Sequence, residues 1–172
     1  MAPHAVIVGP PGSGKSTVAR LVAEGLGLPA RDTDDDVEAV AGATVSDVFV
    51  EQGEDGFRAL ERSAVATALA EHDGILALGG GAVLDPGTRE LLRGRTVVFL
   101  DVGIKDAASR IGLNRDRPLL LGNPRAQWIR LMEARRPVYE EVATVRVDTD
   151  GRTAEEVAAA VLQALDQAEQ AR

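Results

Sequence analysis

The stretch that decides the fold is 9-GPPGSGKST-17, which follows the apolar run 5-AVIV-8 near the start of the chain. Its spacing fits the pattern G-x4-G-K-[S/T] of a phosphate-binding loop between a strand and a helix. In such a loop the glycines let backbone N–H groups approach the phosphates, the lysine reaches the terminal phosphates and the hydroxyl binds Mg²⁺. Because an apolar strand precedes the motif and a helical pattern follows it, the sequence predicts a nucleotide-phosphate site here.

The lysine in this loop is unusual because the chain carries its positive charge almost entirely on arginine. There are 17 arginines but only two lysines, Lys15 and Lys105. Arginine presents a planar fork, whereas lysine presents a compact charge on a flexible stem that can lie along phosphates in a tight loop. We therefore interpret Lys15 as a phosphate-contacting residue.

The composition limits the possible classes of protein. A length of 172 residues suits one domain, and we expect a single domain spanning residues 1–172. Cysteine is absent, which excludes disulfides and thiolate metal sites, so any metal would be held by oxygen atoms. The net charge of −8 argues against a general binder of nucleic acid or of membrane surfaces, because both are anionic. Without a signal peptide or a long apolar span, we expect a cytoplasmic protein.

Short apolar runs alternate with helical patterns along the chain. This alternation predicts an α/β fold of three layers, doubly wound around a five-stranded parallel sheet, with ligands at the carboxyl ends of the strands. Thr153 and Glu156 fit a capping box at the start of the last helix. The predicted strands are 5–8, 75–78, 96–100 and 145–147, with a weaker one at 29–33. The predicted helices are 16–26, 34–41, 46–52, 54–71, 86–93, 105–111, 125–141 and 154–171.

Two carboxylates follow the second predicted strand in 32-DTD-34. Alternate side chains of an extended segment point the same way, so Asp32 and Asp34 would share a direction beside the phosphate loop if the sheet order allows it. One could serve a metal ion and the other could orient a hydroxyl group. The alternative is that acidic residues stabilise the start of the next helix, and we favour this alternative for Asp35 and Asp36.

Three further features are open to a functional or a purely structural interpretation. The glycines 79–81 follow the third strand, where they indicate either a close approach of backbone to a ligand or a flexible connection. Arg58 lies on a strongly amphipathic helix, where an arginine alone usually marks a solvated face. The segment 112–124 is rich in Gly, Asn, Arg and Pro and lacks periodicity, so we interpret it as a short mobile lid.

Taken in order, these motifs resemble the shikimate kinases, small P-loop relatives of the nucleoside monophosphate kinases. The resemblance runs through nearly the whole chain. It implies transfer of the terminal phosphoryl group of ATP to the 3-hydroxyl of shikimate, which gives shikimate 3-phosphate and ADP in aromatic amino-acid biosynthesis. The motifs are GPPGSGKST at 9–17, DTD at 32–34, GEDGFRALE at 53–61, LGGGAV at 78–83, RPLL at 117–120 and RRPVY at 135–139.

The resemblance also implies roles for individual residues, with an acceptor-binding region at about 32–61. Its catalytic residues are Lys15, Asp34 and Arg117. The nucleotide-binding residues are Gly12, Ser13, Gly14, Lys15, Ser16 and Thr17, with Arg117 brought from the lid and Arg110 lying against adenine. For shikimate, Asp34 binds the hydroxyls, Arg58 and Arg136 bind the carboxylate, and Gly79, Gly80 and Gly81 line one edge of the ring. Mg²⁺ is held by Ser16 and, through water, by Asp32, with ATP as co-substrate.

The chain departs from the family pattern at two positions, and other functions stay open at this point. Arg31 is more polar than expected before the aspartates, and Ala154 replaces a proline of some relatives near adenine. A kinase of another polyol acid such as gluconate would keep the phosphate loop but change the acceptor pocket. A nucleoside monophosphate kinase would need room for a second base, and a non-catalytic nucleotide-binding regulator would need no acceptor pocket. We expect a monomer whose ligands are the small molecules ATP and shikimate.

Overall fold

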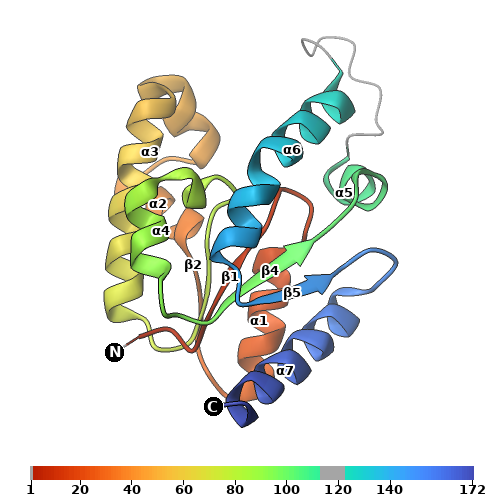
Figure 1. Cartoon of the computed structure of the whole chain (residues 1–172). Helices are drawn as coiled ribbons and strands as arrows, with labels where there is room; N and C mark the ends of the chain where they lie inside the picture. Colours follow the sequence, from red (N-terminus) through yellow and green to blue (C-terminus); the bar gives the residue numbers. More distant parts are fainter. Residues whose placement is uncertain (1, 113–122) are drawn as a thin grey trace.

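The computed structural model describes residues 2–112 and 123–172 (Figure 1). Within these ranges, five parallel strands form one sheet in the order β2-β3-β1-β4-β5, so the predicted doubly wound α/β fold is confirmed. The strands are β1 (Ala5–Val8), β2 (Ala30–Asp32), β3 (Ile75–Ala77), β4 (Val97–Asp101) and β5 (Val145–Asp148). The helices are α1 (Lys15–Leu26), α2 (Thr33–Ala41), α3 (Val45–Glu71), α4 (Pro86–Leu92), α5 (Ile104–Ile111), α6 (Pro124–Val142) and α7 (Ala154–Gln170), with a short 3₁₀ helix η1 (Ala82–Leu84).

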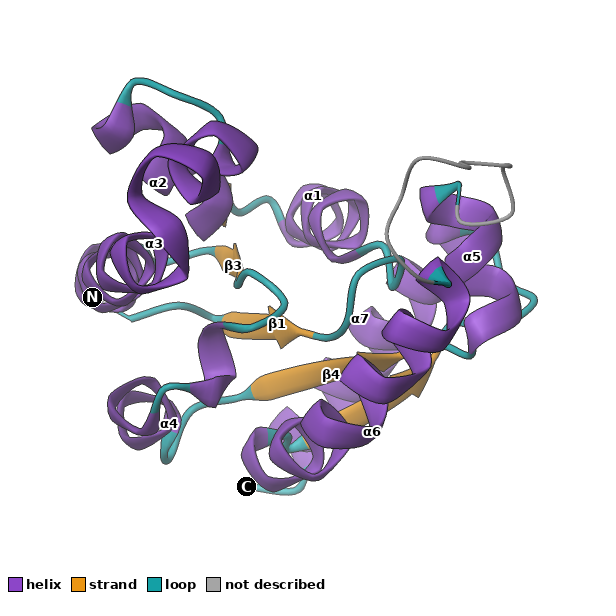
Figure 2. Cartoon of the chain, turned by 90° about the horizontal axis from the view of Figure 1, so that it is seen from above, coloured by secondary structure: helices purple, strands orange, loops and turns teal. Residues whose placement is uncertain are grey.

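The three layers follow from the alternation of side chains along each strand. In β1, Val6 and Val8 face one side of the sheet, while Ala5 and Ile7 face the other. The first side is covered by α3, α4 and α6, and the second by α1 and α7, so that α1 and α6 lie on opposite sides (Figure 2). Because both of their faces are buried, the central strands β1, β3 and β4 are apolar almost throughout, whereas the edge strands β2 and β5 carry charged residues.

The strand order brings the predicted site segments to one edge of the sheet. β1 pairs with β3 on one side and with β4 on the other, and β3 in turn pairs with β2. The phosphate loop after β1, the aspartates after β2 and the glycines after β3 therefore meet at the carboxyl edge. In doubly wound α/β sheets ligands usually bind at this edge. The site lies beside the point where the connections that follow two neighbouring strands run to opposite faces of the sheet.

Two details of the sequence find a physical reason in the structure. The predicted break between the helices 46–52 and 54–71 occurs within α3 at Gly53, whose φ of 72° is a left-handed conformation that favours glycine. A polar residue can occupy position 31 because β2 is an edge strand, from which the Arg31 side chain reaches solvent and charged partners. It pairs with Asp36 at 2.8 Å and with Glu71 at 3.3 Å.

The predicted lid falls mostly outside the described residues. Gly112 ends α5 in a left-handed conformation, and the Asn123 side chain caps α6 by accepting from the backbone N–H groups of residues 125 and 126. Residues 113–122, which include Arg117, are not described. Across residues 2–112 and 123–172, no helix has the length and apolar character needed to cross a membrane.

Candidate active site

The phosphate loop leads directly into α1. Ser13 is buried and its hydroxyl donates to the carbonyl of Pro10 at 2.8 Å, which folds the loop back on itself. Gly14 adopts a left-handed conformation before the helix, and no side chain in the described ranges caps its N-terminus. The first N–H groups of α1 therefore stay available for an anion, as in other phosphate sites at helix N-termini.

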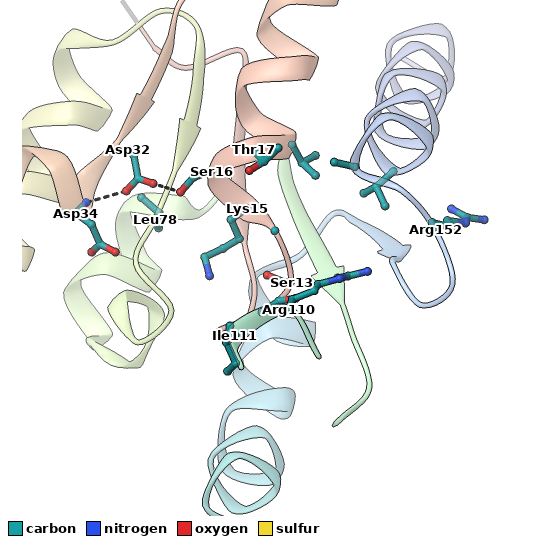
Figure 3. Close-up of a pocket in the computed structure, with 15 residues that line it drawn as sticks. Ser13, Lys15, Ser16, Thr17, Asp32, Asp34, Leu78, Arg110, Ile111 and Arg152 are labelled. Carbon is teal, nitrogen blue, oxygen red and sulfur yellow. Dashed lines mark hydrogen bonds between the residues drawn. The ribbon is translucent and has the colours of Figure 1, made fainter. Parts of the chain in front are cut away.

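A cavity of about 530 Å³ lies along this loop. Asp32 and Asp34 stand at one end and Arg152 at the other (Figure 3). Its walls include the predicted nucleotide-binding residues Gly12, Ser13, Gly14, Lys15, Ser16, Thr17 and Arg110, together with Leu78, Ile111, Ala154 and Val157. The sequence analysis missed Arg152. Its position just after β5, at the carboxyl edge of the sheet, was the signal that could have found it.

Arg110 bridges the phosphate loop and the loop between β5 and α7. One of its terminal nitrogens donates to the carbonyl of Gly12 and to the Thr149 hydroxyl, both at 3.0 Å, and the other donates to the Thr149 carbonyl at 2.9 Å. These bonds hold the guanidinium between the phosphate loop and the loop before α7. The structure therefore places Arg110 in the part of the cavity away from the aspartates.

Lys15 occupies the centre of the site. Its ammonium donates to the carbonyl of Pro10 at 3.2 Å. Burial lowers the pKa of Lys15 to about 8, even though the negative charges of Asp34 and Asp32 raise it. The lysine is thus a desolvated charge that would gain from an anionic ligand.

Ser16 and Asp32 form the pair of oxygen donors that the sequence analysis assigned to Mg²⁺. The Ser16 hydroxyl donates to the Asp32 carboxylate, whose other oxygen accepts from the N–H of Asp34 at 2.9 Å. In residues 2–112 and 123–172, no group of three or more His, Cys, Asp or Glu side chains could hold a metal. A hydroxyl and one carboxylate suit Mg²⁺, which keeps several waters and takes its remaining ligands from substrate phosphates.

Asp34 reaches the same cavity, although not in the way the alternation predicted. Asp32 is extended and caps α2, whereas Asp34 already belongs to the first turn of that helix. Burial and the nearby carboxylates of Asp32 and Glu61 together raise the pKa of Asp34 to about 6, against the opposing charge of Lys15. A carboxylate with such a pKa can accept a proton near neutral pH.

The glycines after β3 lie directly beneath charged side chains. A Cβ atom added to Gly79 would stand 2.7 Å from Oδ1 of Asp34 and 2.8 Å from Oε2 of Glu61. One added to Gly81 would stand 2.5 Å from Nη2 of Arg58. A Cβ atom at either position would displace the ends of these charged side chains, so the glycines let the charged groups lie close to the backbone, which favours the close-approach interpretation of this segment.

Arg58 is fixed by its own helix. Its Nη1 lies 2.7 Å from Oε1 of the buried Glu61, and its guanidinium lies 5.2 Å from the centre of the Phe57 ring. Phe57 in turn stacks on Phe49, with ring centres 4.4 Å apart. The arginine is therefore held rigidly over the glycines and does not simply mark a solvated face.

The second arginine at the glycines is Arg135, whereas the sequence analysis named Arg136. A Cβ atom on Gly80 would lie 3.1 Å from Nη1 of Arg135, and the hydroxyl of Tyr139, one turn further along α6, donates to the Gly80 carbonyl at 2.5 Å. Arg136 instead forms a two-point ion pair with Asp101, at 2.7 and 3.0 Å. Neighbouring residues of a helix point about 100° apart, so both arginines cannot face the glycines. In the motif RRPVY, Arg135 lies four residues before Tyr139, so the two side chains share one face of a helix. This spacing was the signal that favours Arg135 over Arg136.

α6 also contacts the phosphate loop. The indole Nε1 of Trp128 donates to the carbonyl of Pro11 at 2.9 Å. The same helix thus touches the phosphate loop through Trp128 and the acceptor glycines through Arg135 and Tyr139. The sequence analysis did not find this bridge, because it depends on how α6 crosses the sheet.

Comparisons with known proteins agree with this arrangement. A shikimate kinase from Streptomyces avermitilis is 60% identical over 164 residues, which cover 95% of this chain and 96% of the relative. Another from Streptomyces coelicolor is 57% identical over 165 residues, or 96% of each chain. The structure of a shikimate kinase from Acinetobacter baumannii in complex with shikimate superposes with a TM-score of 0.88 at 34% identity, and covers 97% of this chain and 94% of the other. The family model of shikimate kinase matches residues 11–166, and the chain belongs to that family.

Proposed function

We propose that this protein transfers the terminal phosphoryl group of ATP to the 3-hydroxyl of shikimate. The observation that carries the proposal is the floor formed by Gly79, Gly80 and Gly81, which lies beside the phosphate loop with Asp34, Arg58 and Arg135 placed over it. Two arginines and one carboxylate match an acceptor that carries a carboxylate at one end and hydroxyl groups at the other.

Phosphoryl transfer depends mainly on alignment and on stabilisation of charge, because its transition state is loose. Lys15 and the open N–H groups of α1 would bind the phosphates and stabilise the charge on the transferred group. Ser16 and Asp32 would hold Mg²⁺, which would supply neutralisation of negative charge on the phosphates of ATP. Arg110 and Arg152 would lie at the base and sugar of ATP, away from the reacting hydroxyl.

At the acceptor, Arg58 and Arg135 would bind the carboxylate and orient the ring. Asp34 would then accept the proton of the hydroxyl as that oxygen attacks the phosphorus atom. The raised pKa of Asp34 allows this transfer near neutral pH. Arg135 takes the place that the sequence analysis gave to Arg136, since Arg135 is the residue over Gly80.

The proposal is tested by measuring ADP release from MgATP with shikimate, quinate, gluconate and nucleoside monophosphates as separate acceptors. We expect turnover with shikimate well above that with the others, and a product that carries phosphate on the 3-hydroxyl. Faster turnover with gluconate or a nucleotide would replace the proposal with one of those kinases. ATP binding without turnover on any acceptor would favour a regulator.

Replacement of Arg58 by alanine should weaken shikimate binding more than it slows the chemical step. A carboxylate contact is present in both ground and transition states, so its loss raises KM with a smaller effect on kcat. We expect KM for shikimate to rise about 10- to 100-fold, as for loss of a charged hydrogen bond, with KM for ATP nearly unchanged. The measurement is steady-state kinetics with shikimate varied at saturating MgATP.

Arg62→Ala is the matched control, because Arg62 lies one turn away on α3 with 53% of its side chain exposed and its nearest carboxylate oxygen 3.8 Å away. It should behave as wild type. An unchanged KM for shikimate in Arg58→Ala would remove Arg58 from the site.

Turnover should also depend on pH through Asp34. Only its carboxylate form accepts a proton, and its pKa of about 6 means that this form declines as the pH falls below 6. We expect kcat/KM for shikimate to fall about tenfold for each pH unit below that value. The residual activity of Asp34→Asn, measured over the same range, controls for titration of the nucleotide. A wild-type profile that is flat from pH 5 to 7 would contradict the role.

A further inference from the structure

We infer that Arg136 is a positioning residue, which fixes the orientation of α6 so that its neighbour Arg135 faces the acceptor site. The inference rests on the proposed function, in which Arg135 binds the carboxylate of shikimate. It assigns a role to an arginine whose guanidinium pairs with Asp101 at the end of β4, outside the site.

The anchor of Arg136 is a buried carboxylate at the end of β4. Nη1 of Arg136 lies 2.7 Å from Oδ2 of Asp101, and Nη2 lies 3.0 Å from Oδ1. The Asp101 side chain is 7% exposed and belongs to a strand that is buried throughout. A two-point pair between a planar guanidinium and a carboxylate restrains direction as well as distance. Arg136 is thus held in one orientation against a buried strand of the sheet.

Asp101 stays charged and has a second partner. Although burial raises the pKa of Asp101, hydrogen bonds from Arg136 and Arg146 lower it below its ordinary value. Arg146 on β5 donates to Oδ2 of Asp101 through Nε at 3.0 Å and through Nη2 at 2.8 Å, and it also reaches Asp148 at 2.8 Å. Loss of Arg136 therefore leaves Asp101 paired, so the substitution does not strand a buried charge.

α6 needs an anchor at this place because Pro137 follows Arg136. Proline has no N–H group and its ring crowds the carbonyl four residues earlier, so the helix loses one backbone hydrogen bond at this turn. Kinks of helices concentrate at such positions. The two-point pair of Arg136 with Asp101 lies one residue before the weak point and one residue after Arg135. It therefore restrains the helix where the direction of Arg135 is decided.

The opposite explanation is that the ion pairs of Asp101 only stabilise the fold. The two explanations differ in which arginine matters. Arg136 and Arg146 share the same carboxylate, but only Arg136 belongs to α6, and Arg146 belongs to β5. A stabilising role predicts similar kinetic effects from either arginine, whereas positioning predicts an effect on shikimate from Arg136 alone.

The experiment compares Arg136→Ala, Arg146→Ala and Arg130→Ala, the last an exposed arginine of the same helix. Steady-state kinetics and calorimetric binding of shikimate are measured for each, with thermal melts as a check of folding. We expect Arg136→Ala to raise KM and the Kd for shikimate about three- to tenfold, with kcat and KM for ATP unchanged. The other two variants should bind shikimate as wild type. If Arg136→Ala does not fold, Arg136→Lys keeps the charge without the planar fork and should show a smaller rise.

A double-mutant cycle with Arg135→Ala tests whether Arg136 acts through its neighbour. In that background, Arg136→Ala should change KM for shikimate by less than about twofold. An effect that persists there, an equal effect from Arg146→Ala, or no effect of Arg136→Ala would each overturn the inference. A wild-type protein that neither binds nor phosphorylates shikimate would overturn the proposed function itself, so the two failures are distinguishable.

Discussion

Replacement of Lys15 by arginine should give a folded protein whose turnover with shikimate is lower by at least about 10²-fold, as for loss of one transition-state donor. The charge is kept, but its shape changes from a compact ammonium to a wide fork. The ammonium of Lys15 lies within hydrogen-bonding distance of the Pro10 carbonyl, at 3.2 Å, and is desolvated by the surrounding loop. A guanidinium in that space would displace the loop or the phosphates. Steady-state turnover at saturating MgATP and shikimate is the measurement.

The control for this substitution is Lys105→Arg, because Lys105 is the other lysine of the chain and is exposed on α5. It should keep wild-type kinetics and melting temperature. Near-normal turnover of purified Lys15→Arg would contradict the assigned role of Lys15 in stabilising charge on the transferred phosphoryl group.

Replacement of Asp34 by asparagine should lower kcat by about 10²- to 10⁴-fold, the usual contribution of a general base. The side chain keeps its size, but it can no longer accept the proton of the attacking hydroxyl. KM for ATP should change little, because Asp34 lies at the acceptor end of the cavity, over Gly79. Single-turnover measurements with MgATP and shikimate separate this loss from slow product release.

The same substitution should stabilise the protein without ligands. The pKa of Asp34 is raised from 3.8 to about 6, so the folded state binds protons more tightly than the unfolded state, and stability falls as the pH rises through this range. At neutral pH the buried carboxylate lowers the free energy of unfolding by up to about 3 kcal/mol, and asparagine avoids this cost.

The control is Asp35→Asn, because Asp35 is an exposed neighbour on α2, and its replacement should change neither kcat nor stability much. A wild-type kcat in Asp34→Asn would place the proton acceptor elsewhere.

Local chemistry made most of the fold predictable. The phosphate loop requires a strand before it and a helix after it, and the structure has β1 and α1 on either side of residues 9–14. Thr153 and Glu156 form the capping box that their spacing predicts, because that motif depends only on neighbouring residues. The helix break at Gly53 was visible for the same reason. The 3₁₀ helix η1 was missed, since a turn of three apolar residues has no periodicity to detect.

The site was less predictable where it depended on the rotation of a helix. Arg135 and Arg136 are identical in chemistry and adjacent in sequence, so composition cannot say which of them faces the glycines. Which of them faces the glycines depends on the rotation of α6 about its axis. Asp101 and Gly80 fix this rotation through their hydrogen bonds with Arg136 and Tyr139, which are distant from them in the sequence. Likewise, the prediction that residues 32–34 are extended was wrong, because Asp32 is the N-cap of α2 and the helix begins at the next residue.

The contact between Trp128 and the phosphate loop gives the protein a built-in optical reporter. The chain contains a single tryptophan, and its indole N–H donates to the Pro11 carbonyl while the ring is buried against the core. Any shift of that loop alters the polarity around one fluorophore, with no background from a second. We therefore expect the emission of the unlabelled protein to change on nucleotide binding, which a stopped-flow instrument can follow without a dye or a coupled assay. Compounds that bind this loop could then be screened by selective excitation of the indole, since the only phenol in the chain is that of Tyr139.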